Sequence, residues 1–198
     1  MRLLAAILLV MPMSAADLVC LGDSLTAGFG VDPEQAWPVL LQGRLAAAAT
    51  TAGWRVVNAG VSGDTTAGGL RRIDRLLVAK PAAVLVCLGG NDGLRGLPAE
   101  AMQANLDRVL ARIRAAGARP FVAGIEVPTS FPEEDRAAFS AVFPAVATAH
   151  QAPLLPSLLT GVAMVPELNQ ADRIHPNPEG HRVIAARVHA WIAPQLAP

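Results

Sequence analysis

Short apolar runs alternate along the chain with longer segments in which apolar residues recur every three or four positions. The runs are rich in leucine and β-branched residues and are bounded by glycine, proline or polar residues. Such runs are typical of strands buried on both faces of a parallel sheet. Strands are predicted over residues 18–22, 55–59, 83–89, 120–127 and 152–155. Helices are predicted over residues 37–51, 65–78, 99–116, 133–150 and 179–192. This fivefold β-α order predicts one α/β domain, with a five-stranded parallel sheet and helices on both faces.

The first sixteen residues carry the features of a secretory signal peptide rather than of a folded element. Arg2 precedes an apolar run from Leu3 to Met13, and small residues, Ser14 and Ala16, stand where a signal peptidase would read positions −3 and −1. The run is shorter than the about 20 apolar residues that span a bilayer, so stable membrane insertion is not expected. We therefore predict a signal peptide over 1–16, a single domain over 17–198, and export to a bacterial periplasm or the medium.

Composition and charge exclude several classes of function. Of the 198 residues 53% are hydrophobic, and 16 basic residues balance 16 acidic ones. A disordered chain would need lower hydrophobicity and unbalanced charge, and a neutral surface has no field to hold a nucleic acid. The two cysteines cannot build a disulfide scaffold, and no cysteine or histidine cluster has zinc spacing. The composition indicates a compact globular domain, and nothing in it implies a protein partner.

Polar side chains stand among glycines directly after three of the predicted strands. Residues 22–28 read Gly-Asp-Ser-Leu-Thr-Ala-Gly, residues 58–65 read Asn-Ala-Gly-Val-Ser-Gly-Asp-Thr, and residues 89–93 read Gly-Gly-Asn-Asp-Gly. Loops at the carboxyl ends of parallel strands are where such sheets bind ligands. A fourth segment, Asp-Arg-Ile-His-Pro-Asn at 172–177, places an acid three residues before a histidine. We expect these four segments to form one site.

Together these segments contain the groups that nucleophilic catalysis by serine requires. Ser24 is the candidate nucleophile, His175 the base that removes its proton, and Asp172 the acid that orients the imidazole. The negative oxygen of a tetrahedral intermediate needs preorganised donors. The candidate donors are the backbone N–H groups of Ser24 and Gly63 and the side-chain amide of Asn91.

These four segments resemble, in order and spacing, the conserved blocks of the SGNH (GDSL-type) serine hydrolases. The likeness extends from about residue 17 to the last predicted helix, and is closest to the bacterial periplasmic group of thioesterases, lysophospholipases and arylesterases. The resemblance implies a flavodoxin-like, three-layer α/β/α fold. It also implies a broad esterase that hydrolyses acyl thioesters, aryl esters and lysophospholipids through an acyl-enzyme, without a cofactor.

Other functions remain as alternatives at this point. A carbohydrate O-acetyl esterase would use the same catalytic groups, and a flavodoxin-like binding module would share the fold without the chemistry. A dinucleotide site is disfavoured, because the first loop lacks Gly-x-Gly-x-x-Gly. The elbow sequence Gly-x-Ser-x-Gly of α/β-hydrolases is also absent.

Two further sets of residues are given structural interpretations. Cys20 and Cys87 fall on strands predicted to be adjacent, and we expect free buried thiols in preference to a strained bridge. His150, His181 and His189 fall in predicted helices and are interpreted as ordinary surface or boundary residues.

Overall fold

A five-stranded parallel sheet forms the centre of the computed structural model, which describes residues 16–126 and 131–197. The strand order is β2-β1-β3-β4-β5, and every pair of neighbours is parallel. The strands are β1 (Ala16–Gly22), β2 (Trp54–Gly60), β3 (Ala83–Cys87), β4 (Arg119–Ala123) and β5 (Leu154–Leu155). The predicted fold class is confirmed.

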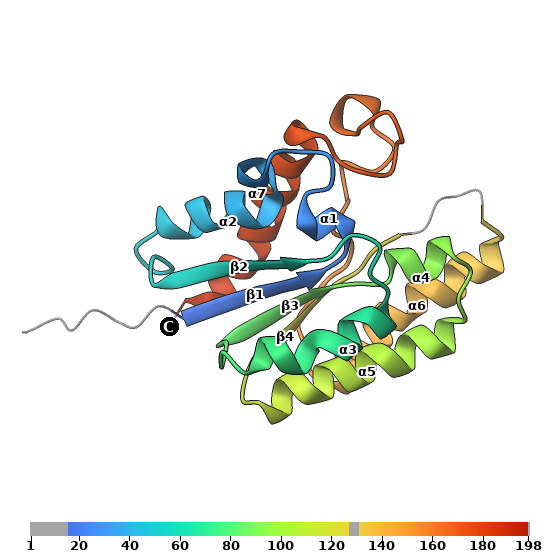
Figure 1. Cartoon of the computed structure of the whole chain (residues 1–198), viewed down its shortest axis with the longest axis horizontal. Coiled ribbons are helices and arrows are strands. Elements are labelled where there is room, and N and C mark those ends of the chain that lie inside the picture. The colour runs from blue at the N-terminus through green and yellow to red at the C-terminus, as the bar shows by residue number, and fades with distance from the viewer. Residues whose placement is uncertain (1–15, 127–130, 198) are drawn as a thin grey trace, which may run out of the picture.

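Helices cover both faces of this sheet, as Figure 1 shows. One face carries α2 (Trp37–Ala46) and α7 (Pro178–Leu196), and the other carries α3 (Thr66–Leu77), α5 (Ala99–Ala115) and α6 (Glu133–Ala149). Four short elements were not predicted: the single-turn helices α1 (Ser24–Ala27) and α4 (Gly90–Leu94), and the 3₁₀ turns η1 (Pro33–Gln35) and η2 (Pro166–Leu168). They are too short to show a hydrophobic period, and the two α-helical turns begin directly after the glycine-rich ends of β1 and β3.

The core lies between the sheet and its two helical layers. All five residues of β3 are buried, and the α5 stripe of Leu106, Val109, Leu110 and Ile113 is at most 1% exposed. The prediction of burial on both faces is wrong for β2, in which only Ala59 is buried. The reason is its place at the edge of the sheet, where it pairs with β1 alone among the described strands.

Most element boundaries differ from the predicted ones by a few residues, and hydrogen bonds account for two of the differences. Helix α2 ends at Ala46, because the buried hydroxyl of Thr51 turns back and donates to the carbonyl of Leu45 at 2.8 Å. Strand β1 begins at Ala16, two residues before the predicted start, and the Ala16 N–H donates to Gly53 O at 2.9 Å. The rest of the predicted signal peptide lies outside the described residues.

Within the two described ranges, 16–126 and 131–197, no helix combines the length and apolar character needed to cross a bilayer.

Candidate active site

Ser24 is the first residue of α1, directly beyond the carboxyl end of β1. The side chain of Asp23 caps this turn by accepting a hydrogen bond from the Leu25 N–H at 3.0 Å. The turn packs directly on the end of β2, since a Cβ added to Gly60 would lie 2.1 Å from the backbone nitrogen of Ala27. A glycine at position 60 is therefore needed for Ser24 to sit where it does.

His175 and Asp172 lie in the loop that precedes α7. One oxygen of Asp172, Oδ1, accepts hydrogen bonds from the backbone N–H groups of Ile174 at 2.9 Å and His175 at 3.0 Å. These bonds fold the loop back on itself, and Arg173 between them adopts the left-handed region with φ 58°. The His175 carbonyl accepts from the Gln170 N–H at 2.8 Å, which fixes the far side of the loop.

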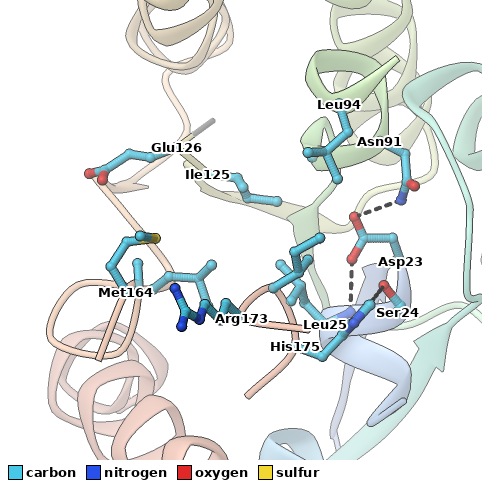
Figure 2. A pocket seen from close by; sticks show the side chains of 14 residues that line it. Asp23, Ser24, Leu25, Asn91, Leu94, Ile125, Glu126, Met164, Arg173 and His175 are labelled. Atoms are coloured by element: carbon cyan, nitrogen blue, oxygen red, sulfur yellow. Dashed lines mark hydrogen bonds between the residues drawn. The ribbon is translucent and has the colours of Figure 1, made fainter. Parts of the chain in front are cut away.

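Figure 2 shows how the loop brings the His175 ring against Ser24. His175 Nε2 lies 2.9 Å from Ser24 Oγ, and His175 Nδ1 lies 2.6 Å from Asp172 Oδ2. The Phe29 ring packs on the imidazole with centroids 4.7 Å apart. These contacts form the nucleophile–base–acid chain seen in serine hydrolases, assembled from residues 151 positions apart.

The electrostatics of Asp172 suit an acid that faces an imidazole. Partial burial raises the pKa of this carboxyl, but hydrogen bonds from the His175 backbone, the His175 ring and the Ile174 backbone outweigh it and lower the pKa to about 2. Asp172 is therefore ionised throughout the neutral range, where it can hold the Nδ1 proton and stabilise an imidazolium.

The three candidate oxyanion donors follow three different strands, β1, β2 and β3. The backbone N–H groups of Ser24 and Gly63 make no hydrogen bond within the described part of the chain. The Asn91 amide nitrogen, Nδ2, by contrast donates to Asp64 O at 3.0 Å and to Asp23 Oδ2 at 3.3 Å. Asn91 lies in α4, at the carboxyl end of β3.

Two arginines that were not predicted as anchors from the sequence hold these loops. Arg72 of α3 donates to Gly22 O at 2.9 Å, to Ala59 O at 2.7 Å and to Asp64 Oδ2 at 2.6 Å. It thereby ties the ends of β1 and β2 to the loop that carries Gly63. Arg95 donates to Gly63 O at 2.8 Å. Both arginines occupy ordinary helical or loop positions in the sequence, where an anchoring arginine looks like a solvated one.

Two buried carboxylates flank the site. Asp92 accepts from the Thr66 N–H at 2.8 Å and the Thr66 hydroxyl at 2.5 Å, and so joins α4 to the start of α3. Asp23 is 1% exposed, and burial raises its pKa to about 6 against the opposing effect of the hydrogen bonds from Leu25 and Asn91.

A cavity of about 220 Å³ opens beside Ser24 and runs away from it between two walls (Figure 2). One end is polar and holds Ser24, His175 and Asn91. The lining beyond this polar end is mainly aliphatic and comprises Leu25, Leu94, Ile125, Leu159, Ala163, Met164 and Ile174. Glu126 and Arg173 also line the cavity, on opposite walls. The volume is below the about 300–1,000 Å³ of pockets that enclose drug-sized ligands, so part of a larger substrate would remain in solvent.

His150 and His189 are half-buried, as expected of boundary residues, but the interpretation of His181 is wrong. His181 is not a surface residue: it is 1% exposed and its Nδ1 accepts from the Trp37 N–H at 3.2 Å, because α7 packs on α2 there. Burial first, and then the nearby His175 charge, lower the pKa of His181 to about 4. Cys20 and Cys87 are buried free thiols, as expected.

No metal centre is indicated in the described part of the chain. Among residues 16–126 and 131–197, no three His, Cys, Asp or Glu side chains are grouped so that they could hold a metal ion.

Known proteins resemble this chain over most of its length. Residues 20–183 match the GDSL-like lipase/acylhydrolase family. Esterase TesA of Pseudomonas aeruginosa is 45% identical over 174 residues, which cover 87% of this chain and 86% of the relative. Thioesterase 1/protease 1/lysophospholipase L1 of Escherichia coli K12 is 40% identical over 194 residues, covering 97% and 89%. The crystal structure of TesA superposes with a TM-score of 0.86 at 42% identity, covering 90% of this chain and 98% of that one.

These similarities define the chain as an ester-cleaving hydrolase with the α/β fold of SGNH hydrolases. It belongs to the GDSL-like lipase/acylhydrolase family, as the resemblance of its four sequence segments implied.

Proposed function

We propose that the protein hydrolyses carboxylic esters and acyl thioesters through an acyl-enzyme on Ser24. The observation that carries this proposal is the chain of contacts from Ser24 Oγ to His175 Nε2 at 2.9 Å and from His175 Nδ1 to Asp172 at 2.6 Å. His175 Nε2 takes the hydroxyl proton as Ser24 Oγ bonds to the carbonyl carbon of the substrate. Asp172 stabilises the imidazolium that forms.

The carbonyl oxygen then carries the negative charge of the tetrahedral intermediate. The donors that receive it are the N–H groups of Ser24 and Gly63, which have no partner among residues 16–126 and 131–197, and the Asn91 amide. Collapse of the intermediate breaks the bond to the leaving group, and the proton on His175 passes to the departing alcohol or thiol. Water next attacks the acyl-enzyme with His175 again as base, which releases the acid and restores Ser24.

The cavity supports an acyl group of aliphatic character. Its walls beyond Ser24 are largely leucine, isoleucine and methionine side chains, which offer little hydrogen bonding to a sugar. This lining favours fatty-acyl thioesters, aryl esters and lysophospholipids over acetylated carbohydrates. A panel of acyl-CoAs, nitrophenyl esters, lysophospholipids and acetylated sugars tests that order, and fastest turnover of the acetylated sugars would reverse it.

The nucleophile is tested by Ser24→Ala, with Ser140→Ala as the matched control on the exposed surface of α6. We expect Ser24→Ala to remain folded and to lose about 10⁶-fold in kcat, while Ser140→Ala keeps the wild-type rate. Circular dichroism checks the fold, and a nitrophenyl ester assay measures the rate. Retention of most activity by Ser24→Ala would refute the mechanism.

We also propose that the enzyme is exported and acts in the periplasm or outside the cell. The support is the charged start, the apolar run and the small residues that end at Ala16. Mass spectrometry of the protein recovered from the periplasm or medium should find Asp17 as the first residue. A mature chain that still begins at Met1 would contradict export by this route.

A further inference from the structure

The Asn91 amide differs from the other two oxyanion donors because both of its hydrogens are already engaged. A carboxamide nitrogen has two hydrogens. One is directed to Asp64 O at 3.0 Å, and the other to Asp23 Oδ2 at 3.3 Å. Both acceptors offer only oxygen lone pairs, so neither could face the Asn91 oxygen without repulsion. The pair of acceptors therefore determines that the nitrogen end of this amide, and not its oxygen end, faces them.

Asp64 and Asp23 orient the Asn91 amide through different kinds of acceptor. The Asp64 acceptor is a main-chain carbonyl. Its position is fixed by the loop and by the hydrogen bond from Arg72 to the Asp64 side chain. The Asp23 acceptor is a side-chain carboxylate that is 1% exposed, and no arginine, lysine or histidine within 16–126 and 131–197 forms an ion pair with it. Burial of an unpaired carboxylate is costly, and an uncharged cap such as Asn would hold the Leu25 N–H equally well. Capping alone does not account for an acid at this position.

We propose that Asp23 is a positioning residue for the oxyanion hole: its buried Oδ2 holds the Asn91 amide with the nitrogen toward the reacting centre. Asp23 touches neither the substrate nor the reacting atoms in this role and acts through Asn91. During turnover the longer of the two Asn91 contacts, the one to Asp23, is the one shared with the substrate oxygen, since the 3.0 Å bond to Asp64 O is the stronger. This inference rests on the proposed function and adds a residue to it.

The substitution Asp23→Asn separates this role from capping. Asparagine keeps an oxygen for the Leu25 N–H and places an NH₂ group where Oδ2 stood, so it presents a donor to the donor on Asn91. The Asn91 amide must then turn away or face a repulsive neighbour. A neutral side chain in the same buried space also removes the cost of desolvating an acid. We therefore expect Asp23→Asn to unfold at the same temperature as the wild type or higher, and to be slower.

The experiment is a double-mutant cycle between positions 23 and 91, measured as kcat and KM on a soluble nitrophenyl ester. Asn91→Ala should lower kcat by about 10²–10³-fold. Asp23→Asn should lower kcat by about tenfold or more, with KM changed less than twofold. In the Asn91→Ala background, Asp23→Asn should change kcat by less than threefold, because the group it positions is gone.

Asp92→Asn is the matched control, since Asp92 is an equally buried carboxylate one residue from Asn91 that bonds to Thr66 instead. Asp92→Asn should change kcat by the same factor in the wild-type background and in the Asn91→Ala background. Three results would overturn the inference: equal losses from Asp23→Asn in both backgrounds, an unchanged kcat in Asp23→Asn, or a loss of thermal stability that parallels the loss of rate. Each is distinct from failure of the proposed function, which would appear as an active Ser24→Ala enzyme.

Discussion

The packing of α1 on the end of β2 makes Gly60 a sensitive position. A Cβ at this residue would lie 2.1 Å from the Ala27 backbone nitrogen, 2.6 Å from the Ala27 Cα and 2.7 Å from the Thr26 carbonyl carbon. All three atoms belong to the backbone, so no change of rotamer relieves the overlap. Moving the first contact from 2.1 Å to the 3.0 Å that real Cβ atoms keep requires roughly 0.9 Å of displacement.

We expect Gly60→Ala to be both less stable and less active. Overpacking of this kind costs about 1–3 kcal/mol of unfolding free energy. Because α1 begins with Ser24, a shift of α1 by this amount would lengthen the 2.9 Å contact with His175 beyond hydrogen-bond range. A misplacement of about 1 Å at reacting groups can cost about 10²-fold in rate, and we expect a loss of that order in kcat.

Gly43 supplies the matched control for Gly60. It is an exposed residue inside α2, and a Cβ there would meet nothing within 4 Å. Gly43→Ala should raise the unfolding free energy by about 0.5–1 kcal/mol through helix propensity and leave the rate unchanged. Urea unfolding and initial rates on a nitrophenyl ester measure both quantities. A Gly60→Ala enzyme with the wild-type urea midpoint and rate would refute the steric reasoning.

Two further predictions concern buried charge and the loop anchor. The pKa of His181 is lowered to about 4, so between pH 6.5 and 4 the unfolded chain binds a proton that the folded chain excludes, and stability is lost as pH falls through this window. The free energy of unfolding, measured by urea at pH 7, 5.5 and 4.5, should therefore fall further for the wild type than for His181→Gln, by up to about 3 kcal/mol. Equal falls in the two proteins would contradict the assignment. Arg72→Lys replaces a guanidinium group that donates to three acceptors with a single ammonium group. This change should lower the unfolding free energy by about 1–3 kcal/mol and lower kcat as well. An Arg72→Lys enzyme with the wild-type urea midpoint would show that one contact suffices.

The layered fold was predictable because each long element has a hydrophobic pattern of its own. The stripe of α5 and the uniform apolar run of β3 identify a helix and a central strand without any knowledge of their neighbours. The half-exposed character of β2 was not predictable in the same way. It depends on β2 lying at the edge, and strand order is a property of the whole chain.

In the candidate site, too, residues with a local sequence pattern were predicted and residues that depend on distant contacts were not. Ser24, Asn91 and His175 were found because glycine-rich strand ends and an acid–histidine pair stand out in sequence. Arg72 was not found, because its three acceptors belong to segments that are far apart along the chain. The buried His181 was misread for a related reason, since its contact to Trp37 spans 144 residues.

The separation of 151 residues between Ser24 and His175 also has a consequence for the timing of synthesis. Chains grow from the N-terminus at about 5–20 residues per second, so roughly 8–30 s pass between the addition of the nucleophile and that of its base. Until the segment that holds Asp172 and His175 has been made and docked, the serine has no partner to take its proton. On the proposed mechanism, a nascent chain or one truncated before His175 lacks the base and should not cleave esters, so ester cleavage would report that the chain has been made and folded through His175.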